Sequence, residues 1–260
     1  MSGFLVAQQT RIQVLTPKIE RLPGCLLNVD AMDSGSMFQD AARLTRAGIN
    51  DPVGGVLQPS GNHASQTVTA AKPMRGIGWN DLPVLIFDGG DYLICDSLAA
   101  SAGVSGSDKP FTVVTAFKLP SVIPTHYLWS LNSSSIANTL DGIIFQGTTY
   151  LLSRRDDAGG IANPSVIAAN TNPHVAMFLF SGTTLTFIVD GVTLINEVAR
   201  NVGVLTIDLV TIGARRSLGS PTIYLQGSIG QLAVLNRRIT TPEAMWATHL
   251  FGAKWGIVTL

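Results

Sequence analysis

The sequence predicts an all-β protein: one antiparallel β-sandwich that ends in a single short helix. From residue 24 onward, short apolar and β-branched segments alternate with turns rich in Gly, Pro, Asn, Asp and Ser. A helical pattern appears only between residues 235 and 257. Strands at this spacing, without helices between them, are typical of antiparallel sandwiches and barrels.

Residues 1–23 differ from the rest of the chain and are predicted to form an N-terminal assembly arm. Apolar and polar side chains alternate here, and two prolines interrupt the pattern. Such a segment can add as a strand to the sheet of another subunit. The alternative is a first strand, or a frayed terminus, of the same domain. The side chains expected to make the assembly contacts are Arg11, Ile12, Val14, Leu15 and Ile19.

The sandwich domain is predicted to span residues 24–260. Ser181-Gly182 and Asp190-Gly191 each lie between two strand-like segments and predict tight hairpin turns, where Gly supplies the positive φ that the turn needs. Cys25 and Cys95 both lie in apolar strand-like stretches. They are interpreted as buried thiols, although a single disulfide between them stays open.

The helical pattern lies in the segment LNRRITTPEAMWATHLFGAKWGI. Thr240 precedes Glu243 by three residues, which is the spacing of a capping box, while Thr241 followed by Pro242 is a competing start. Gly252 either ends the helix or marks its last turn. About three turns are too short to be stable alone, so this helix is expected to dock on the sandwich.

Four segments, in order, carry a family resemblance: LLNVDAMDSGSMFQDA (26–41), PSGNHASQTVTAAKP (59–73), LIFDGGDYL (85–93), and FIVDGV (187–192) with the strands and helix that follow it. Over residues 25–260 the chain resembles the concanavalin A-like lectin/glucanase superfamily, in particular the laminin-G-like modules of bacteriophage virion proteins. The resemblance implies a jelly-roll sandwich whose last strand leads into an edge helix, with Trp255 as a buried anchor. The sequence departs from the pattern at Val56 and Gln58, where similar proteins often carry Trp and Asp.

The composition excludes several classes of function. Lys plus Arg and Asp plus Glu each number 17, and this zero net charge argues against nucleic acid as a partner. No run approaches the 18 apolar residues of a membrane helix, and the N-terminus lacks the features of a signal peptide, so synthesis in a cytoplasm is expected.

Glucanases of this superfamily place acidic residues at alternate positions of a strand. In this chain, Glu20, Glu197 and Glu243 each lack an acidic residue two positions away. The sequence therefore predicts a protein that is not an enzyme.

No cofactor and no metal are predicted. The four histidines form no recognised ligand pair, and His63 is expected to serve as a structural hydrogen-bonding group. Oxygen ligands for calcium at a rim could come from four side chains that no motif selects: Asp88, Asp91, Asn132 and Asp141. Four aromatic residues could form a sugar platform but are expected to pack in the core or at strand edges: Trp79, Tyr127, Trp129 and Tyr150.

These observations predict a structural protein of a bacteriophage virion. It would be a capsid decoration or cement protein, or a tail or baseplate component, attached through its N-terminal arm to other virion proteins and to copies of itself. The alternative is a carbohydrate-binding module that recognises a cell-surface glycan. That alternative predicts a sheet face or loop rim where aromatic side chains lie near amide and carboxylate groups.

Overall fold

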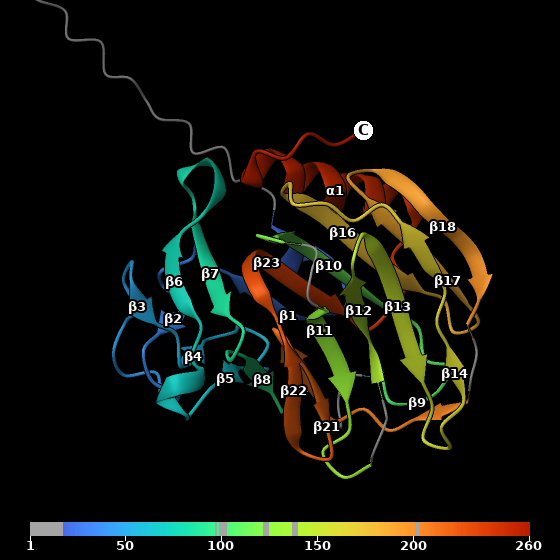
Figure 1. The fold of residues 1–260 in the computed structure, drawn as a ribbon, viewed down its shortest axis with the longest axis horizontal. Coiled ribbons are helices and arrows are strands. Elements are labelled where there is room, and N and C mark those ends of the chain that lie inside the picture. The colour runs from blue at the N-terminus through green and yellow to red at the C-terminus, as the bar shows by residue number, and fades with distance from the viewer. Residues whose placement is uncertain (1–17, 97, 99–102, 122–124, 137–139, 201–202) are drawn as a thin grey trace, which may run out of the picture.

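The computed structural model describes residues 18–260, except 97, 99–102, 122–124, 137–139 and 201–202. Two large antiparallel sheets, here called sheet A and sheet B, stack face to face, and one α-helix packs beside them (Figure 1). This architecture confirms the predicted all-β sandwich with a C-terminal helix.

Sheet A has nine strands among the described residues. Its described strands, in spatial order, are β18 (Val192–Ala199), β17 (Thr184–Val189), β16 (His174–Phe180), β10 (Phe111–Lys118), β23 (Gln226–Leu235), β7 (Pro83–Asp88), β6 (Met74–Ile77) and β3 (Asp51–Pro52). A further strand, β1 (Cys25–Asp30), pairs with the second half of β23, while β7 pairs with its first half. The long strand β23 therefore joins the first and last parts of the chain in one sheet.

Sheet B forms the opposite layer. Its described strands, in spatial order, are β14 (Ile161–Ala162), β13 (Thr149–Arg155), β12 (Leu140–Gln146), β11 (His126–Asn132), β20 (Leu209–Ile212), β8 (Leu93–Cys95), β5 (Ala64–Ser65), β4 (Gly55–Val56) and β2 (Met37–Phe38), and β15 (Ser165–Ile167) also pairs with β13. Two small ribbons complete the strands: β9 (Gly106–Ser107) with β19 (Val204–Leu205), and β21 (Ala214–Ser217) with β22 (Ser220–Tyr224). Three short 3₁₀ turns are η1 (Ile19–Arg21), η2 (Thr69–Ala71) and η3 (Trp79–Asp81).

The core lies between the two sheets because alternate side chains of each strand point inward. Aromatic rings join the layers: Trp129 of sheet B meets Phe178 of sheet A edge-on at 5.4 Å between ring centroids. Phe117 and Phe145 make a second contact between the sheets at 5.3 Å. These rings are buried, so Trp129 belongs to the core, as the sequence predicted.

The helix α1 (Thr241–Trp255) packs against β16 and β10 on the face of sheet A that points away from sheet B (Figure 1). The side chains of Thr240 and Glu243 form a reciprocal capping box, and Pro242 lies in the first turn, so both predicted start signals are used. Gly252 lies in the last turn, and Gly256 ends the helix with a φ of 63°. A Cβ on Gly230 of β23 would lie 2.8 Å from the Trp255 ring, so glycine lets this buried ring lie flat against the strand.

The two predicted hairpin turns are confirmed. The turn between β17 and β18 uses Asp190 and Gly191 with φ values of 51° and 87°, and Gly182 lies in the turn before β17. Neither Cys25 nor Cys95 forms a disulfide in the described part of the chain. Among the described residues, no helix is long and apolar enough to cross a membrane.

The start of the packed domain lies earlier than predicted. Ile19 was assigned to the assembly arm, but its side chain is fully buried in the main core. The neighbouring Glu20 accepts a hydrogen bond from the Asn28 amide of β1 at 2.7 Å. Burial and this contact fix η1 against β1, so Ile19 packs with the sandwich of its own chain. The other four predicted arm residues lie outside the described residues: Arg11, Ile12, Val14 and Leu15.

Candidate ligand-binding hollows

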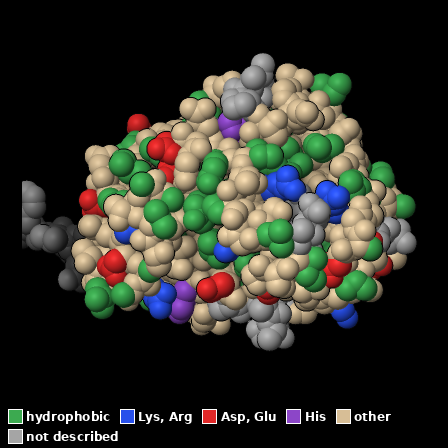
Figure 2. All heavy atoms as spheres, turned by 60° about the horizontal axis from the view of Figure 1, so that its bottom comes forward, with side chains coloured by type: hydrophobic (Ala, Val, Ile, Leu, Met, Phe, Trp, Pro, Cys, Tyr) green, Lys and Arg blue, Asp and Glu red, His purple; other side chains and the backbone are tan. Residues whose placement is uncertain are grey.

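Charged groups are sparse on the surface of the molecule. Figure 2 shows one face on which acidic and basic side chains are scattered among neutral and hydrophobic ones, with no broad region of one sign. This distribution agrees with the equal numbers of acidic and basic residues in the sequence. Recognition by this face would therefore depend on shape and hydrogen bonding more than on net charge.

The outer face of sheet A is hollowed on both sides of α1 within the described part of the chain. One hollow, called the strand-end hollow, lies where β7, β23 and β10 meet near the C-terminal end of α1. The other, called the helix groove, lies between α1 and the strands β17 and β18. Their volumes are similar, about 790 Å³ and about 680 Å³.

The strand-end hollow is built from three neighbouring strands. Its floor carries Ile86 and Asp88 of β7 and Gln226 and Ser228 of β23, and Lys118 ends β10 beside them. Residues two apart on a strand point to the same face, which is why both pairs open into the hollow. The register places Asp88 opposite Gln226, and Ser228 opposite both Ile86 and Lys118. Trp79, Pro120, Thr171 and Asn172 complete the rim.

Most polar side chains of the strand-end hollow have no protein partner. The side chains of Lys118, Asn172, Gln226 and Ser228 make no hydrogen bond or ion pair to another described residue, whereas Asp88 accepts one from the Gly90 backbone at 2.9 Å. From the strand spacing and the register, the Cα atoms of Lys118 and Asp88 lie about 12 Å apart. The hollow therefore presents a cation and an anion at opposite ends, with amide and hydroxyl groups between them.

Trp79 forms the wall between this hollow and α1. Its indole Nε1 donates to the backbone oxygen of Trp255 at 3.1 Å, and the two rings lie 5.7 Å apart between centroids. Only 7% of Trp79 is exposed, so an edge of the ring reaches the hollow rather than a full face. The ring is held in place before any ligand arrives, because both its hydrogen bond and its packing are already made.

The turn after β7 holds a second carboxyl close to Asp88. Asp91 is buried, and its Oδ2 accepts a hydrogen bond from the Asp88 backbone at 3.0 Å. Burial raises the pKa of Asp91 to about 6, and the neighbouring Asp88 carboxylate adds to this shift. The charge beside the strand-end hollow therefore changes near pH 6.

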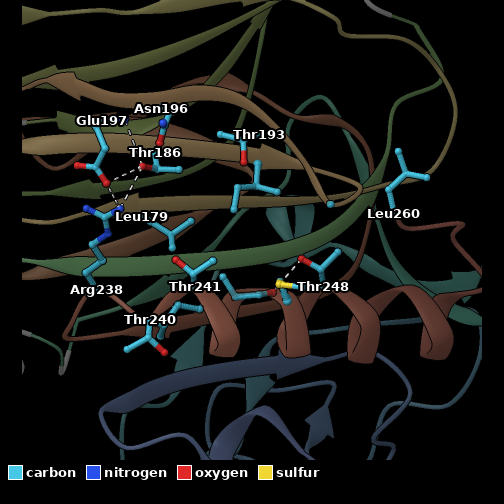
Figure 3. A pocket seen from close by; sticks show the side chains of 15 residues that line it. Leu179, Thr186, Thr193, Asn196, Glu197, Arg238, Thr240, Thr241, Thr248 and Leu260 are labelled. Atoms are coloured by element: carbon cyan, nitrogen blue, oxygen red, sulfur yellow. Dashed lines mark hydrogen bonds and ion pairs between the residues drawn. The ribbon is translucent and has the colours of Figure 1, made fainter.

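The helix groove has an apolar floor and polar side chains on both of its walls (Figure 3). Leu179, Ile188, Ile239 and Ala244 line its base, and Met245 stands beside it on α1 with 58% of its surface exposed. The polar side chains that line it come from both walls: Thr186, Thr193, Asn196 and Glu197 from the sheet, and Arg238, Thr240, Thr241 and Thr248 from the helix side.

An ion pair closes one end of the helix groove. Arg238 donates to the Glu197 carboxylate, which also accepts from the hydroxyls of Thr184 and Thr186 (Figure 3). The hydrogen bond from Arg238 is the main reason that the pKa of Glu197 is lowered to about 2. A bulge in β18 sets two residues, Asn196 and Glu197, opposite Thr186, so both point into the groove.

The outer face of sheet B is partly covered by the chain itself. The ribbon of β21 and β22 folds over β11, where Ser130 donates to the Ala214 oxygen at 2.9 Å and Asn132 to the Arg216 oxygen at 3.1 Å. Tyr127 and Ile144 are buried in a small cluster on sheet B, and burial raises the pKa of Tyr127 to about 12. This part of the sandwich therefore offers no open sugar platform.

The structure separates the residues that the sequence singled out. Of the four candidate platform aromatics, Tyr127, Trp129 and Tyr150 are buried away from both hollows, and only Trp79 borders one. Asp88 and Asp91 share a turn, whereas Asn132 bonds under the β21–β22 ribbon and the side chain of Asp141 lies outside the described part. Among the described residues, no group of three or more His, Cys, Asp or Glu could hold a metal ion.

Two loop predictions have clear outcomes. His63 accepts a hydrogen bond from the Gln58 backbone at 3.0 Å, which confirms its structural role. Gln58, at the position where the sequence departs from the family pattern, is buried and accepts from the Asn28 backbone at 2.8 Å. This loop therefore ties β1 to its neighbours.

The sequence did not indicate the residues of the strand-end hollow other than Asp88 and Trp79. Lys118, Asn172, Gln226 and Ser228 lie in separate strands and loops, and none belongs to a motif. A polar residue at the end of an apolar strand is the only signal, and Lys118 after the buried strand β10 is an example.

No family model and no curated protein matches the chain. Solved structures, in contrast, do match the chain. The CBM40 module of the Ruminococcus gnavus IT-sialidase, bound to α2,3-sialyllactose, superposes with a TM-score of 0.51 and 14% identity, over 64% of this chain and 96% of that one. The leech intramolecular trans-sialidase matches with a TM-score of 0.51 and 17% identity, over 64% of this chain and 27% of that one.

A third match is shorter. NanB sialidase from Streptococcus pneumoniae, at 22% identity and a TM-score of 0.46, covers 52% of this chain, and the chain spans about a quarter (23%) of its length. At these identities the likeness to the first two structures establishes the fold, an antiparallel β-sandwich of two sheets, and no more.

Proposed function

We propose that this chain is a carbohydrate-binding module and that the strand-end hollow is its glycan site. The observation that carries the proposal is the set of polar side chains without protein partners, Lys118, Asn172, Gln226 and Ser228, gathered around an apolar patch. Sugars offer hydroxyl groups that need donors and acceptors, and C–H faces that pack on apolar surface. Ile86 and the edge of Trp79 supply the apolar surface. The hollow therefore combines both kinds of contact in one place.

The fold neighbours support this proposal over a structural role in a particle. The CBM40 module covers almost the whole of its own chain in the superposition, and its structure was determined with a bound glycan. A sandwich of this kind can therefore act as a glycan-binding unit without further domains. Binding without catalysis fits the open hollow, where Asp88 is the single carboxylate among the lining residues.

A glycan array probed with the full-length chain tests the proposal. We expect binding to a subset of glycans with dissociation constants that calorimetry can measure. Gln226→Ala should then weaken binding about tenfold, because it removes a hydrogen-bonding side chain from the centre of the hollow. Gln146→Ala is the matched control, since Gln146 is also an exposed glutamine at a strand end but lies on sheet B, outside the hollow.

Two results would contradict the proposal. One is uniform failure to bind any glycan by a chain that remains folded. The other is binding that Gln226→Ala and Gln146→Ala weaken to the same extent.

The virion role predicted from the sequence stays a prediction. The two structures that establish the fold come from sialidases and not from phage proteins, and the predicted arm lies mostly outside the described residues. Mass spectrometry of purified particles would test it, and absence of the protein from the particles would contradict it. Glycan binding is compatible with either location, because it depends only on the hollow.

A further inference from the structure

The helix groove differs from a glycan site because its charged groups already have partners. Glu197 is held by Arg238 and by two threonine hydroxyls, so little of its hydrogen-bonding capacity remains for a ligand. Leu179, Ile239 and Ala244 of the floor are at most 3% exposed. The apolar surface that a ligand can reach is that of the half-buried Ile188 and of Met245 and Leu260, which are 58% and 82% exposed. Exposed apolar side chains along a groove beside a helix suit a ligand that buries apolar side chains of its own.

Three polar side chains of the groove have no partner among the described residues. Thr193 and Asn196 stand on the wall formed by β18, and Thr241 stands on the wall formed by α1 (Figure 3). Hydroxyl and amide groups on both sides of an apolar floor can bond the backbone of an extended peptide that lies between them. The groove therefore fits a short extended segment with apolar side chains on one side.

We propose that the helix groove docks residues 11–15 of a second copy of this chain. The segment reads Arg-Ile-Gln-Val-Leu, so in an extended conformation Ile12 and Val14 share one face and Arg11 and Gln13 the other. Ile12 and Val14 pack against Ile188 and Met245. Arg11 and Gln13 point to water, and the backbone bonds Thr193, Asn196 and Thr241.

The short length of chain between Lys18 and the docking segment indicates that the segment comes from a second copy and not from the same copy. The chain enters the described structure at Lys18, next to η1, which packs against β1. From β1 to β17 the sheet order is β1, β23, β10, β16, β17, which is four strand spacings or about 19 Å. Val14 is four residues from Lys18 and extends at most about 14 Å from it. The groove of its own copy is therefore too far away.

Cysteine crosslinking between differently tagged copies tests the docking. One preparation carries Val14→Cys and the other Thr193→Cys, both in the full chain with Cys25→Ser. After mixing and mild chemical oxidation, we expect a disulfide-linked dimer that contains both tags. Thr222→Cys replaces Thr193→Cys in the control, because Thr222 is also an exposed strand threonine but lies on the β21–β22 ribbon. The control should give at least tenfold less dimer.

A second variant separates docking from chance contact. Ile12→Asp in the chain that carries Val14→Cys should reduce the crosslinked dimer at least tenfold, because a carboxylate does not pack favourably against the apolar side chains of Ile188 and Met245. Equal crosslinking at residues 193 and 222, or no effect of Ile12→Asp, would overturn the proposal. So would a disulfide that forms only within a chain carrying both cysteines. Glycan binding in the strand-end hollow is measured separately, and neither result decides the other.

Discussion

The two hollows of sheet A share a face, a helix and a similar volume, yet they differ in how their polar groups are satisfied. In the helix groove, Glu197 and Arg238 form an ion pair, and two threonine hydroxyls donate further hydrogen bonds to the Glu197 carboxylate. In the strand-end hollow, Lys118 and Gln226 have no partner among the described residues. The two hollows therefore differ in whether their charged side chains are already paired, and not in their size.

Loss of the Trp255 ring should have the largest effect, because this ring packs α1 against Gly230 of sheet A and lies beside Trp79. Trp255 is fully buried against Gly230 and accepts the indole hydrogen bond of Trp79 through its backbone oxygen. We expect Trp255→Ala to lower the free energy of unfolding by about 3–5 kcal/mol. Denaturant unfolding measures this. A loss below about 1 kcal/mol would show that α1 does not depend on this anchor.

The Asp91 carboxyl should make the stability around the strand-end hollow depend on pH. Its pKa is raised from 3.8 to about 6 by burial, so between these values the folded chain holds a proton that the unfolded chain has released. The contribution of Asp91 to the free energy of unfolding therefore falls as pH rises from 3.8 to about 6. Asp91→Asn should raise the free energy of unfolding by about 1–2 kcal/mol at pH 8 and leave it nearly unchanged at pH 4. Denaturant unfolding at both pH values measures the difference; an equal effect at both would contradict the assignment.

The N-terminal end of α1, beside the helix groove, should respond to pH in the opposite direction. Arg237 donates to both oxygens of Glu243 at 2.7 and 2.8 Å, and this lowers the pKa of Glu243 from 4.5 to about 2. Its contribution is therefore present above pH 4.5 and lost as pH falls towards 2. Glu243→Ala should cost about 1 kcal/mol at pH 7, because the capping box is broken. The same loss at pH 2 would show that charge is not involved.

The smallest effect should come from the exposed apolar side chain of Met245 beside the helix groove. Met245 is largely exposed, so Met245→Ala should change the free energy of unfolding by less than about 0.5 kcal/mol. It should nevertheless reduce the crosslink between residues 14 and 193 of two copies. A large loss of stability would mean that Met245 packs in the free protein.

The sequence predicted the architecture better than the sites, for a physical reason. Strand alternation, the Asp190–Gly191 turn and the Thr240–Glu243 capping box are local patterns, and each is found in the structure. The strand-end hollow depends on the register that sets Asp88 opposite Gln226, 138 positions later in the chain. No local pattern encodes that pairing.

Burial explains the two residues that were hardest to place. Ile19 alternates with the apolar residues before it, so the pattern could not distinguish an arm from a segment packed on its own core. Trp79 follows Gly78 in a turn-rich stretch, and its partner Trp255 lies at the other end of the chain. Long-range contacts of this kind decide exposure, and composition does not show them.

The most direct test of the central claim is a titration of the ¹⁵N-labelled full-length chain with a glycan identified on the array. If the strand-end hollow is the site, backbone amide signals of residues 86–91, 118–119 and 226–228 should shift with the indole N–H of Trp79 and saturate at one glycan per chain. Signals of residues 186–197, which line the helix groove, should stay unchanged. Shifts confined to residues 186–197, or to the outer face of sheet B, would contradict the assignment.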